Sequence, residues 1–292
     1  MGEYYRSVPT SKEFKKIAGS KEGTVGKVYY YLLSCAKPHI DFESGITMYL
    51  ETTEETTGKR SELCNKTKTK DKPAQKGKLN IAINTYKSAI EILTQPLCNE
   101  DGEPIKDENG RYFRLLRHKT RNKKEKAYWT DFEIGKINVP GFLFQNIKSQ
   151  TLKDLALRDN KYIVQVYAHI LYICYSASNK KGKYNYTPNH LVCGKYFWEV
   201  MGWNKPSNSQ KRSINSALII LEEMGLIETE HITNHGQPYK LITKVNLTTQ
   251  QPKIRELSDD EVITQYNSKT HEVRQVKVKD MFKDKDKGWL AF

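Results

Sequence analysis

The sequence predicts an α+β protein, mainly helical with small β-hairpins, that consists of two similar domains in tandem. The first observation behind this prediction is a set of three matches that occur in the same order in both halves of the chain. The matches are Val8-Pro9 with Val139-Pro140, 26–33 with 164–171, and 88–93 with 216–221. Short apolar patterns recur by chance, but three in one order indicate two related domains of roughly 120 residues each.

The second and third observations are the length and the charge of the chain. A chain of 292 residues matches two domains of ordinary size. Its 48 Lys and Arg exceed its 34 Asp and Glu, which gives a formal net charge of +14. This excess indicates a polyanionic partner, which could be DNA, RNA or an acidic membrane surface. A basic protein without such a partner is the alternative.

The sequence disfavours several other classes of protein. It has no stretch of about 18 apolar residues and no signal-peptide core within 1–16, so we expect a cytoplasmic protein that does not enter a membrane. Its five cysteines are scattered and form no CxxC pair, which is typical of reduced thiols. Nuclease, zinc-protease and phosphate-loop motifs are missing from the sequence. We therefore expect a binding protein and not an enzyme, with no metal and no cofactor.

The second domain, expected at 126–250, predicts three helices followed by a hairpin. Apolar residues recur at helical spacing over 162–176. Thr187-Pro188 is typical of a helix start, and Leu191 and Val192 would lie on the apolar side of that second helix. A third helix is expected over about 207–224, with a core side made of Ile214, Leu218 and Leu221. The hairpin strands would be 226–232 and 239–247, around a tip at 234–238.

Three helices followed by a two-stranded hairpin resemble the winged-helix family. The resemblance rests on the order of a helix, Gly225, Leu226-Ile227-Glu228, a hairpin and Tyr239-x-Leu241. It implies that the third helix contacts DNA through side chains that bond to base edges and phosphates. The expected DNA-binding residues are Ser207, Asn208, Ser209, Gln210, Lys211, Arg212 and Asn215, with His235 at the tip of the hairpin, or wing. An ordinary polar helix face, or one that binds protein, is the alternative.

The first domain, expected at 1–125, would contain a Lys-rich insertion at about 57–78. This insertion would be either a mobile loop that follows phosphates or a solvated, disordered segment. The third helix of this domain is expected over about 79–94, with Ala82, Ile83, Tyr86, Ile90 and Leu93 mostly facing the core. Its DNA-facing residues would be Lys78, Asn80, Asn84 and Lys87. The wing would be 97–116, and its acidic tip would point away from DNA or touch a partner.

The densest positive run of the chain, 117–126, would lie between the two domains. Its cations would contact phosphates and release counterions from DNA. The expected contact residues are Arg117, Lys119, Arg121, Lys123 and Lys124. A solvated linker or hairpin is the alternative.

Residues 251–292 predict a charged C-terminal tail that ends in three large apolar side chains. These side chains, Trp289, Leu290 and Phe292, would dock either on the protein itself or on a partner such as a host replication protein. The last residues resemble a sliding-clamp-binding peptide, although the Gln that usually begins such a peptide is missing.

The arrangement as a whole resembles the tandem winged-helix replication initiators of plasmids and phages of Gram-positive hosts. The segments that carry this resemblance are 137–144, Tyr167-x-x-Ile170-Leu171 and 207–228. It implies a sequence-specific double-stranded DNA-binding protein that binds repeated origin sequences, recruits host replication proteins and could form a homo-oligomer on DNA. A winged-helix transcriptional regulator is one alternative. A protein-interaction adaptor that does not bind DNA is another.

Overall fold

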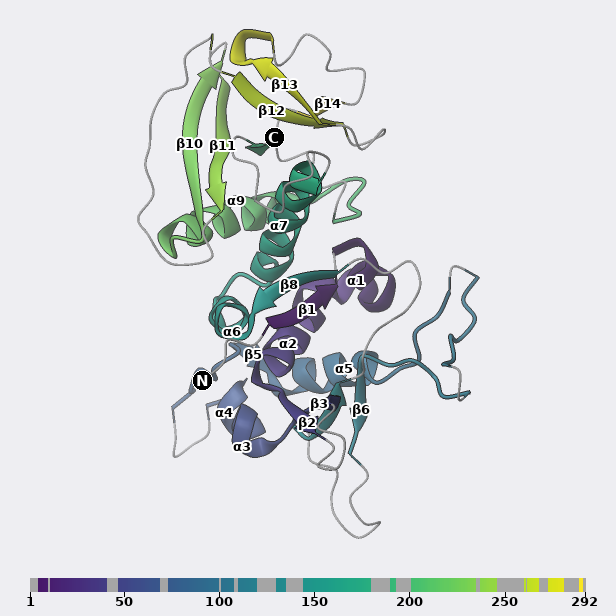
Figure 1. Cartoon of the computed structure of the whole chain (residues 1–292). Helices are drawn as coiled ribbons and strands as arrows, with labels where there is room; N and C mark the ends of the chain where they lie inside the picture. The colour runs from purple at the N-terminus through teal and green to yellow at the C-terminus, as the bar shows by residue number, and fades with distance from the viewer. Residues whose placement is uncertain are drawn as a thin grey trace. The chain divides into compact units, whose positions relative to one another are not determined.

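The chain folds as a mixture of helices and small, mostly antiparallel sheets, as the computed structural model in Figure 1 shows. The structure describes residues 5–9, 11–40, 47–68, 73–99, 101–107, 110–119, 130–134, 144–179, 190–192, 201–234, 237–245, 260, 262–267, 273–280 and 289–290. The predicted α+β class is confirmed. The chain divides into two compact units, Met1–Val164 and Gln165–Phe292, so the first unit extends beyond residue 125.

Helix α2 (Glu22–Cys35) forms the centre of the first unit. Every residue of α2 except Thr24 is buried. Three helices pack against it, namely α1 (Ser11–Ala18), α5 (Ile83–Leu93) and α6 (Ser149–Leu157). Phe14 of α1 lies against Tyr29 and Tyr30, with ring centroids 5.8 and 5.4 Å apart. A helix that is buried on all sides must be covered by several other elements, which explains why α6 belongs to this unit.

Three sheets complete the described part of the first unit, and two of them lie outside the Lys-rich insertion. The larger sheet has the order β2-β3-β7-β6 and is antiparallel throughout. Its strands are β2 (Lys37–Ile40), β3 (Thr47–Thr52), β7 (Phe132–Ile134) and β6 (Leu116–His118). The smaller sheet pairs β1 (Tyr5–Pro9) with β8 (Phe144–Lys148). Arg6 of β1 donates hydrogen bonds to the carbonyl oxygens of Leu33 and Ala36, at 3.1 and 2.5 Å, where α2 ends.

Much of the Lys-rich insertion is structured. It contains the end of α3 (Glu54–Thr57), all of α4 (Arg60–Leu63), and β4 (Cys64–Asn65), which pairs in parallel with β5 (Ile81–Ala82). Lys66 and Gln75 exchange two backbone hydrogen bonds of 2.8 and 3.1 Å. Many of the described residues of the insertion are therefore held by short elements or backbone hydrogen bonds, which argues against both a mobile loop and a disordered segment for those residues. Residues 69–72 lie outside the described residues.

Gly77 allows two segments of this insertion to approach each other closely. A Cβ atom at Gly77 would lie 2.4 Å from the carbonyl carbon of Cys64 and 2.5 Å from the carbonyl oxygen of Leu63. We predict that Gly77→Ala lowers the free energy of unfolding by about 1–3 kcal/mol, because backbone atoms must move to admit the methyl group. Urea denaturation of the full chain measures this loss.

The matched control is Gly110→Asn. Gly110 has a φ of +74° and open space around its Cβ position, and Asn tolerates this backbone region. The control should change the free energy of unfolding by no more than about 0.5 kcal/mol. Equal stabilities for the two variants would contradict the proposed role of Gly77.

The second unit combines two long helices with a sheet. The helices are α7 (Ile163–Asn179), which begins at the end of the first unit, and α9 (Asn208–Glu223). The sheet order is β10 (Ile227–Asn234), β11 (Gln237–Val245), β9 (His190–Val192), β12 (Val262–Asn267) and β13 (Val273–Lys277). The predicted core side of α9 is confirmed, since Ile214, Leu218 and Leu221 are buried.

In the second unit, strands occur in two segments where the sequence predicted a helix and a charged tail. Leu191 and Val192 were expected on a helix but lie in β9, because this segment pairs with Lys240 and Leu241 of β11. The expected charged tail contributes strands to the same sheet, and the short strand β14 (Trp289–Leu290) pairs with β12. Phe292 lies outside the described residues. Among the described residues, no helix is long and apolar enough to cross a membrane.

Candidate nucleic-acid interface

Helix α5 presents the polar face that the sequence predicted for the first unit. Tyr86, Ile90 and Leu93 are buried, as predicted. Ala82 and Ile83 were expected to face the core but are exposed, with Ile83 at 38%. The reason is that α5 begins at Ile83 and Ala82 belongs to strand β5, so the helical spacing does not extend back to residue 79.

Asn80, expected on α5, lies in the turn before it. Its backbone φ is +51°, a left-handed conformation that Asn adopts more readily than most residues. The Asn80 amide nitrogen donates to Asp159 Oδ1 at 3.0 Å, and its amide oxygen accepts from Asn65 Nδ2 at 3.2 Å. Asn80 is therefore engaged with the protein itself and helps to shape the turn into α5.

Asp159 connects this turn to the basic insertion. Its carboxylate accepts from Lys76 Nζ at 2.9 Å and from Asn80, and these bonds lower the pKa of Asp159. The neighbouring Arg158 carbonyl accepts from Lys27 Nζ of α2 at 2.7 Å. A chain of contacts thus runs from the buried helix α2 to the start of α5. In the same insertion, the ammonium nitrogen of Lys78 lies 3.5 Å from Glu62 Oε2.

Asn84 and Lys87 remain on the outer side of α5. Asn84 is exposed and Lys87 is half-buried. Asn84 also lines a groove of about 380 Å³ together with Lys21 and Thr24 at the start of α2. Lys21 Nζ donates to Ser88 Oγ of α5 at 3.1 Å. Sequence analysis did not identify Lys21 or Thr24, because only folding brings the first turn of α2 beside α5.

The hairpin that follows α5 is formed by β6 and β7, which corrects the predicted wing at 97–116. In this hairpin Leu116 pairs with Ile134 and His118 pairs with Phe132. The described residues of 97–113 fold back on themselves instead, since the Leu97 amide donates to the Phe113 carbonyl at 2.8 Å. The apolar residues Leu116, Phe132 and Ile134 are buried, whereas the acidic segment near 99–107 is mostly exposed, which explains why the later pair of strands joins the sheet.

The densest positive run therefore lies in the connection between two paired strands and not between two domains. Arg117 is part of β6, and Lys119 forms an ion pair with Glu51 of β3. The expected contact residues Arg121, Lys123 and Lys124 lie outside the described residues. Their place in the sequence puts them between β6 and β7.

In the second unit, helix α9 carries the predicted polar face near its N-terminus. Asn208, Ser209, Arg212 and Asn215 are exposed and Lys211 is half-buried. Arg212 and Asn215 lie three positions apart, which places them on one side of the helix. His235 lies outside the described residues.

Ser207 and Gln210 have a structural role at the start of α9. Ser207 Oγ accepts from the Gln210 amide at 3.2 Å, and Gln210 Oε1 accepts from the Ser207 amide at 2.8 Å. These reciprocal bonds form a capping box. Both residues were expected to contact DNA, and in the structure their side chains bond to the helix end.

We predict that Ser207→Ala lowers the free energy of unfolding by about 0.5–2 kcal/mol, because a helix N–H loses its acceptor. Ser209→Ala is the control from the same turn and should change it by no more than about 0.5 kcal/mol. Chemical denaturation followed by circular dichroism measures both. Equal losses for the two variants would show that the capping box does not stabilise the fold more than another serine of the same turn does.

The two units share one pattern of pairing. In the first unit, β3, which lies upstream of the exposed helix α5 with the short elements α3, α4, β4 and β5 between them, pairs with β7, the second strand of the hairpin after that helix. In the second unit, β9 pairs in the same way with β11. Both pairs are antiparallel. In each unit the first strand of the hairpin, β6 or β10, therefore lies at the edge of the sheet, next to the second strand of the hairpin.

Comparisons with known proteins gave no match to a family model, to a curated protein or to a solved structure. Within the residues described, no group of His, Cys, Asp and Glu side chains is arranged to hold a metal ion. The candidate interface therefore rests on the helix faces, the hairpins and their charges.

Proposed function

We propose that this chain is a sequence-specific double-stranded DNA-binding protein composed of two winged-helix domains. We further propose that it acts as a replication initiator that binds repeated origin sequences of a plasmid or phage. The observation that carries the proposal is the pairing pattern that occurs in both units around an exposed polar helix. The net charge of +14 supports a polyanionic partner for these helices.

The order of elements supports the winged-helix assignment. The first unit has α2, β2, β3, the short helices α3 and α4, the two-residue strands β4 and β5, α5, and the β6–β7 hairpin. The second unit has α7, β9, α9 and the β10–β11 hairpin. In helix-turn-helix proteins the recognition helix enters the major groove. By this comparison α5 and α9 are the recognition helices, and each following hairpin is a wing that lies near the DNA backbone or the minor groove.

The distribution of positive charge supports DNA over a protein partner. In the first unit, basic residues lie on both sides of α5 along the chain. Lys66 and Lys68 are exposed in the insertion before it, and the run at 117–126 is in the wing after it. Cations on either side of a recognition helix can contact phosphates and so fix its position on the duplex.

The exposed residues of the two recognition helices supply the base contacts in this proposal. Arg212 and Asn215 have the donors and acceptors that suit guanine and adenine edges, respectively. Asn84 and Lys87 contribute in the first unit. Two major grooves on one face of a duplex are about 34–36 Å apart, so the proposal places the two helices in neighbouring turns of one site.

We predict that Arg212→Ala weakens binding to a duplex selected from a random pool by about 1–3 kcal/mol, because a bidentate contact to guanine is lost. Arg212→Lys is the matched control. It keeps the charge but loses the planar fork, so it should retain binding to random DNA and lose preference for the selected duplex. Fluorescence anisotropy with both duplexes measures these affinities.

An equal loss on selected and random DNA in Arg212→Ala, restored by Arg212→Lys, would show that Arg212 is only a phosphate contact. A transcriptional regulator with the same fold would bind sites beside promoters, whereas an initiator's gene should lie beside the repeats that it binds. A protein-interaction adaptor predicts absent or salt-insensitive binding to DNA.

A further inference from the structure

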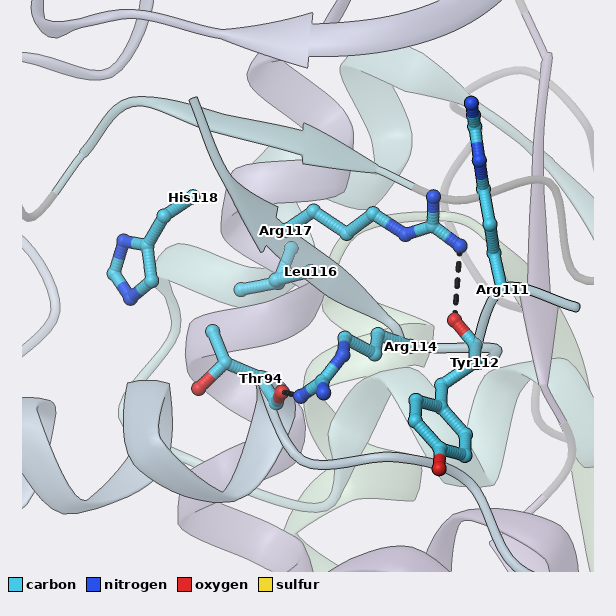
Figure 2. Close-up of a pocket in the computed structure, with 7 residues that line it drawn as sticks. All are labelled: Thr94, Arg111, Tyr112, Arg114, Leu116, Arg117 and His118. Carbon is cyan, nitrogen blue, oxygen red and sulfur yellow. Dashed lines mark hydrogen bonds between the residues drawn. The ribbon is translucent and has the colours of Figure 1, made fainter. Parts of the chain in front are cut away.

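A pocket of about 360 Å³ lies between the end of α5 and strand β6 of the first unit (Figure 2). Its lining has a strongly positive character. The lining residues are Thr94, Arg111, Tyr112, Arg114, Leu116, Arg117 and His118. Three of these seven side chains are guanidinium groups, which stay positively charged at any physiological pH. None of the seven is acidic.

Two of the arginines are held in place by backbone carbonyls, as the dashed lines in Figure 2 show. Arg114 donates to the carbonyl oxygen of Thr94, the residue at the C-terminal end of α5. Arg117 donates to the carbonyl oxygen of Tyr112 at 2.9 Å. Each contact uses one of the five N–H donors of a guanidinium group, so other donors remain for a ligand.

Arg111 is placed at the pocket by a tight turn. The backbone amides of Gly110 and Arg111 both donate to Asp107, to its carbonyl oxygen at 2.9 Å and to its carboxylate at 2.8 Å. Lys106 adds a further cation nearby, with its ammonium 5.0 Å from the centre of the Tyr112 ring. The described part of 97–113, which the sequence predicted as part of a wing, thus brings positive charge to the start of β6.

His118 contributes a polar group to the pocket. Its ring lies against Phe132, with centroids 5.0 Å apart. Partial burial lowers the pKa of His118, which favours the neutral form of the imidazole. A neutral imidazole can donate one hydrogen bond to an anion.

Three arginines around one pocket repel one another unless an anion lies between them. In the part of the chain that the structure describes, none of the three forms an ion pair with a carboxylate. A planar guanidinium group can donate two parallel hydrogen bonds to two oxygens of a phosphate, and arginine is the usual residue where a phosphate is recognised in this way. The chemistry of the lining therefore fits a phosphate.

We infer that this pocket is a phosphate-binding site, and that a backbone phosphate of duplex DNA occupies it beside the wing. The inference rests on the proposed function for the source of the phosphate. DNA is favoured as the source because β6 lines the pocket and contains the start of the positive run at 117–126, which continues in the sequence after this strand.

The test compares a double variant, Arg111→Gln with Arg117→Gln, with a control that loses the same charge. The control is Lys37→Gln with Lys161→Gln, two exposed lysines outside the pocket. Lys37 lies on β2, at the opposite edge of the sheet from β6. If the double variant does not fold, Arg111→Gln alone serves, since no hydrogen bond of the Arg111 side chain is present among the described residues.

The first measurement is the affinity of each full-length protein for a random duplex across a salt series. The slope of log K against log salt should become shallower by about 0.9 in the pocket variant, which is the value for one lost phosphate contact. The control should keep the wild-type slope. Equal slopes for the wild type and the pocket variant would overturn DNA as the occupant.

The second measurement separates a DNA phosphate from a free phosphate compound and does not depend on DNA binding. Pyrophosphate should raise the Tm of the wild type and of the lysine control, but not of the arginine variant, at matched ionic strength. If pyrophosphate acts alike on all three proteins, the phosphate site is overturned. If the wild type binds no duplex, the proposed function fails, and the pyrophosphate result alone decides whether the pocket binds phosphate.

Discussion

The burial of helix α2 is the constraint on which the first unit depends. Nearly every residue of this helix is buried. Its surface is covered by α1, α5, α6 and the strands at its ends, which all pack against it. Lys27 of α2 bonds to the Arg158 carbonyl, and Asp159 then holds Lys76 and Asn80. The position of helix α5 is therefore set from the core outward, and its polar side is left exposed.

The helices were the part of the fold that sequence reasoning predicted best. Helical spacing and capping are local properties, so the buried side of α9 and its start near Ser207 follow from a few neighbouring residues. The strands depend on distant partners. His190–Val192 becomes a strand because it pairs with β11, about fifty residues later, and no local signal contains that information.

The hairpin after α5 also depends on a distant strand and could not be assigned from the sequence alone. The segment 97–116 has a turn-rich centre between apolar residues, and the run at 117–126 could be a linker or a hairpin, so the sequence alone offers two candidate hairpins. The structure selects the second because Phe132 and Ile134 can be buried against β3. For the candidate site, the exposed polar faces of α5 and α9 could be predicted from the sequence. The contact of Asn80 with Asp159 and the pocket around Arg114 could not be predicted, since both depend on residues that only the fold brings together.

The central claim of this account is that two winged-helix units bind one duplex, and the most direct test is the binding of the wild-type chain to DNA. Purified protein would be titrated with random duplex and with duplex from the neighbourhood of its own gene across a salt series. The account predicts a steep dependence on salt together with strong preference for repeats near the gene. Absence of binding at physiological salt would contradict it and favour a protein partner for these helices.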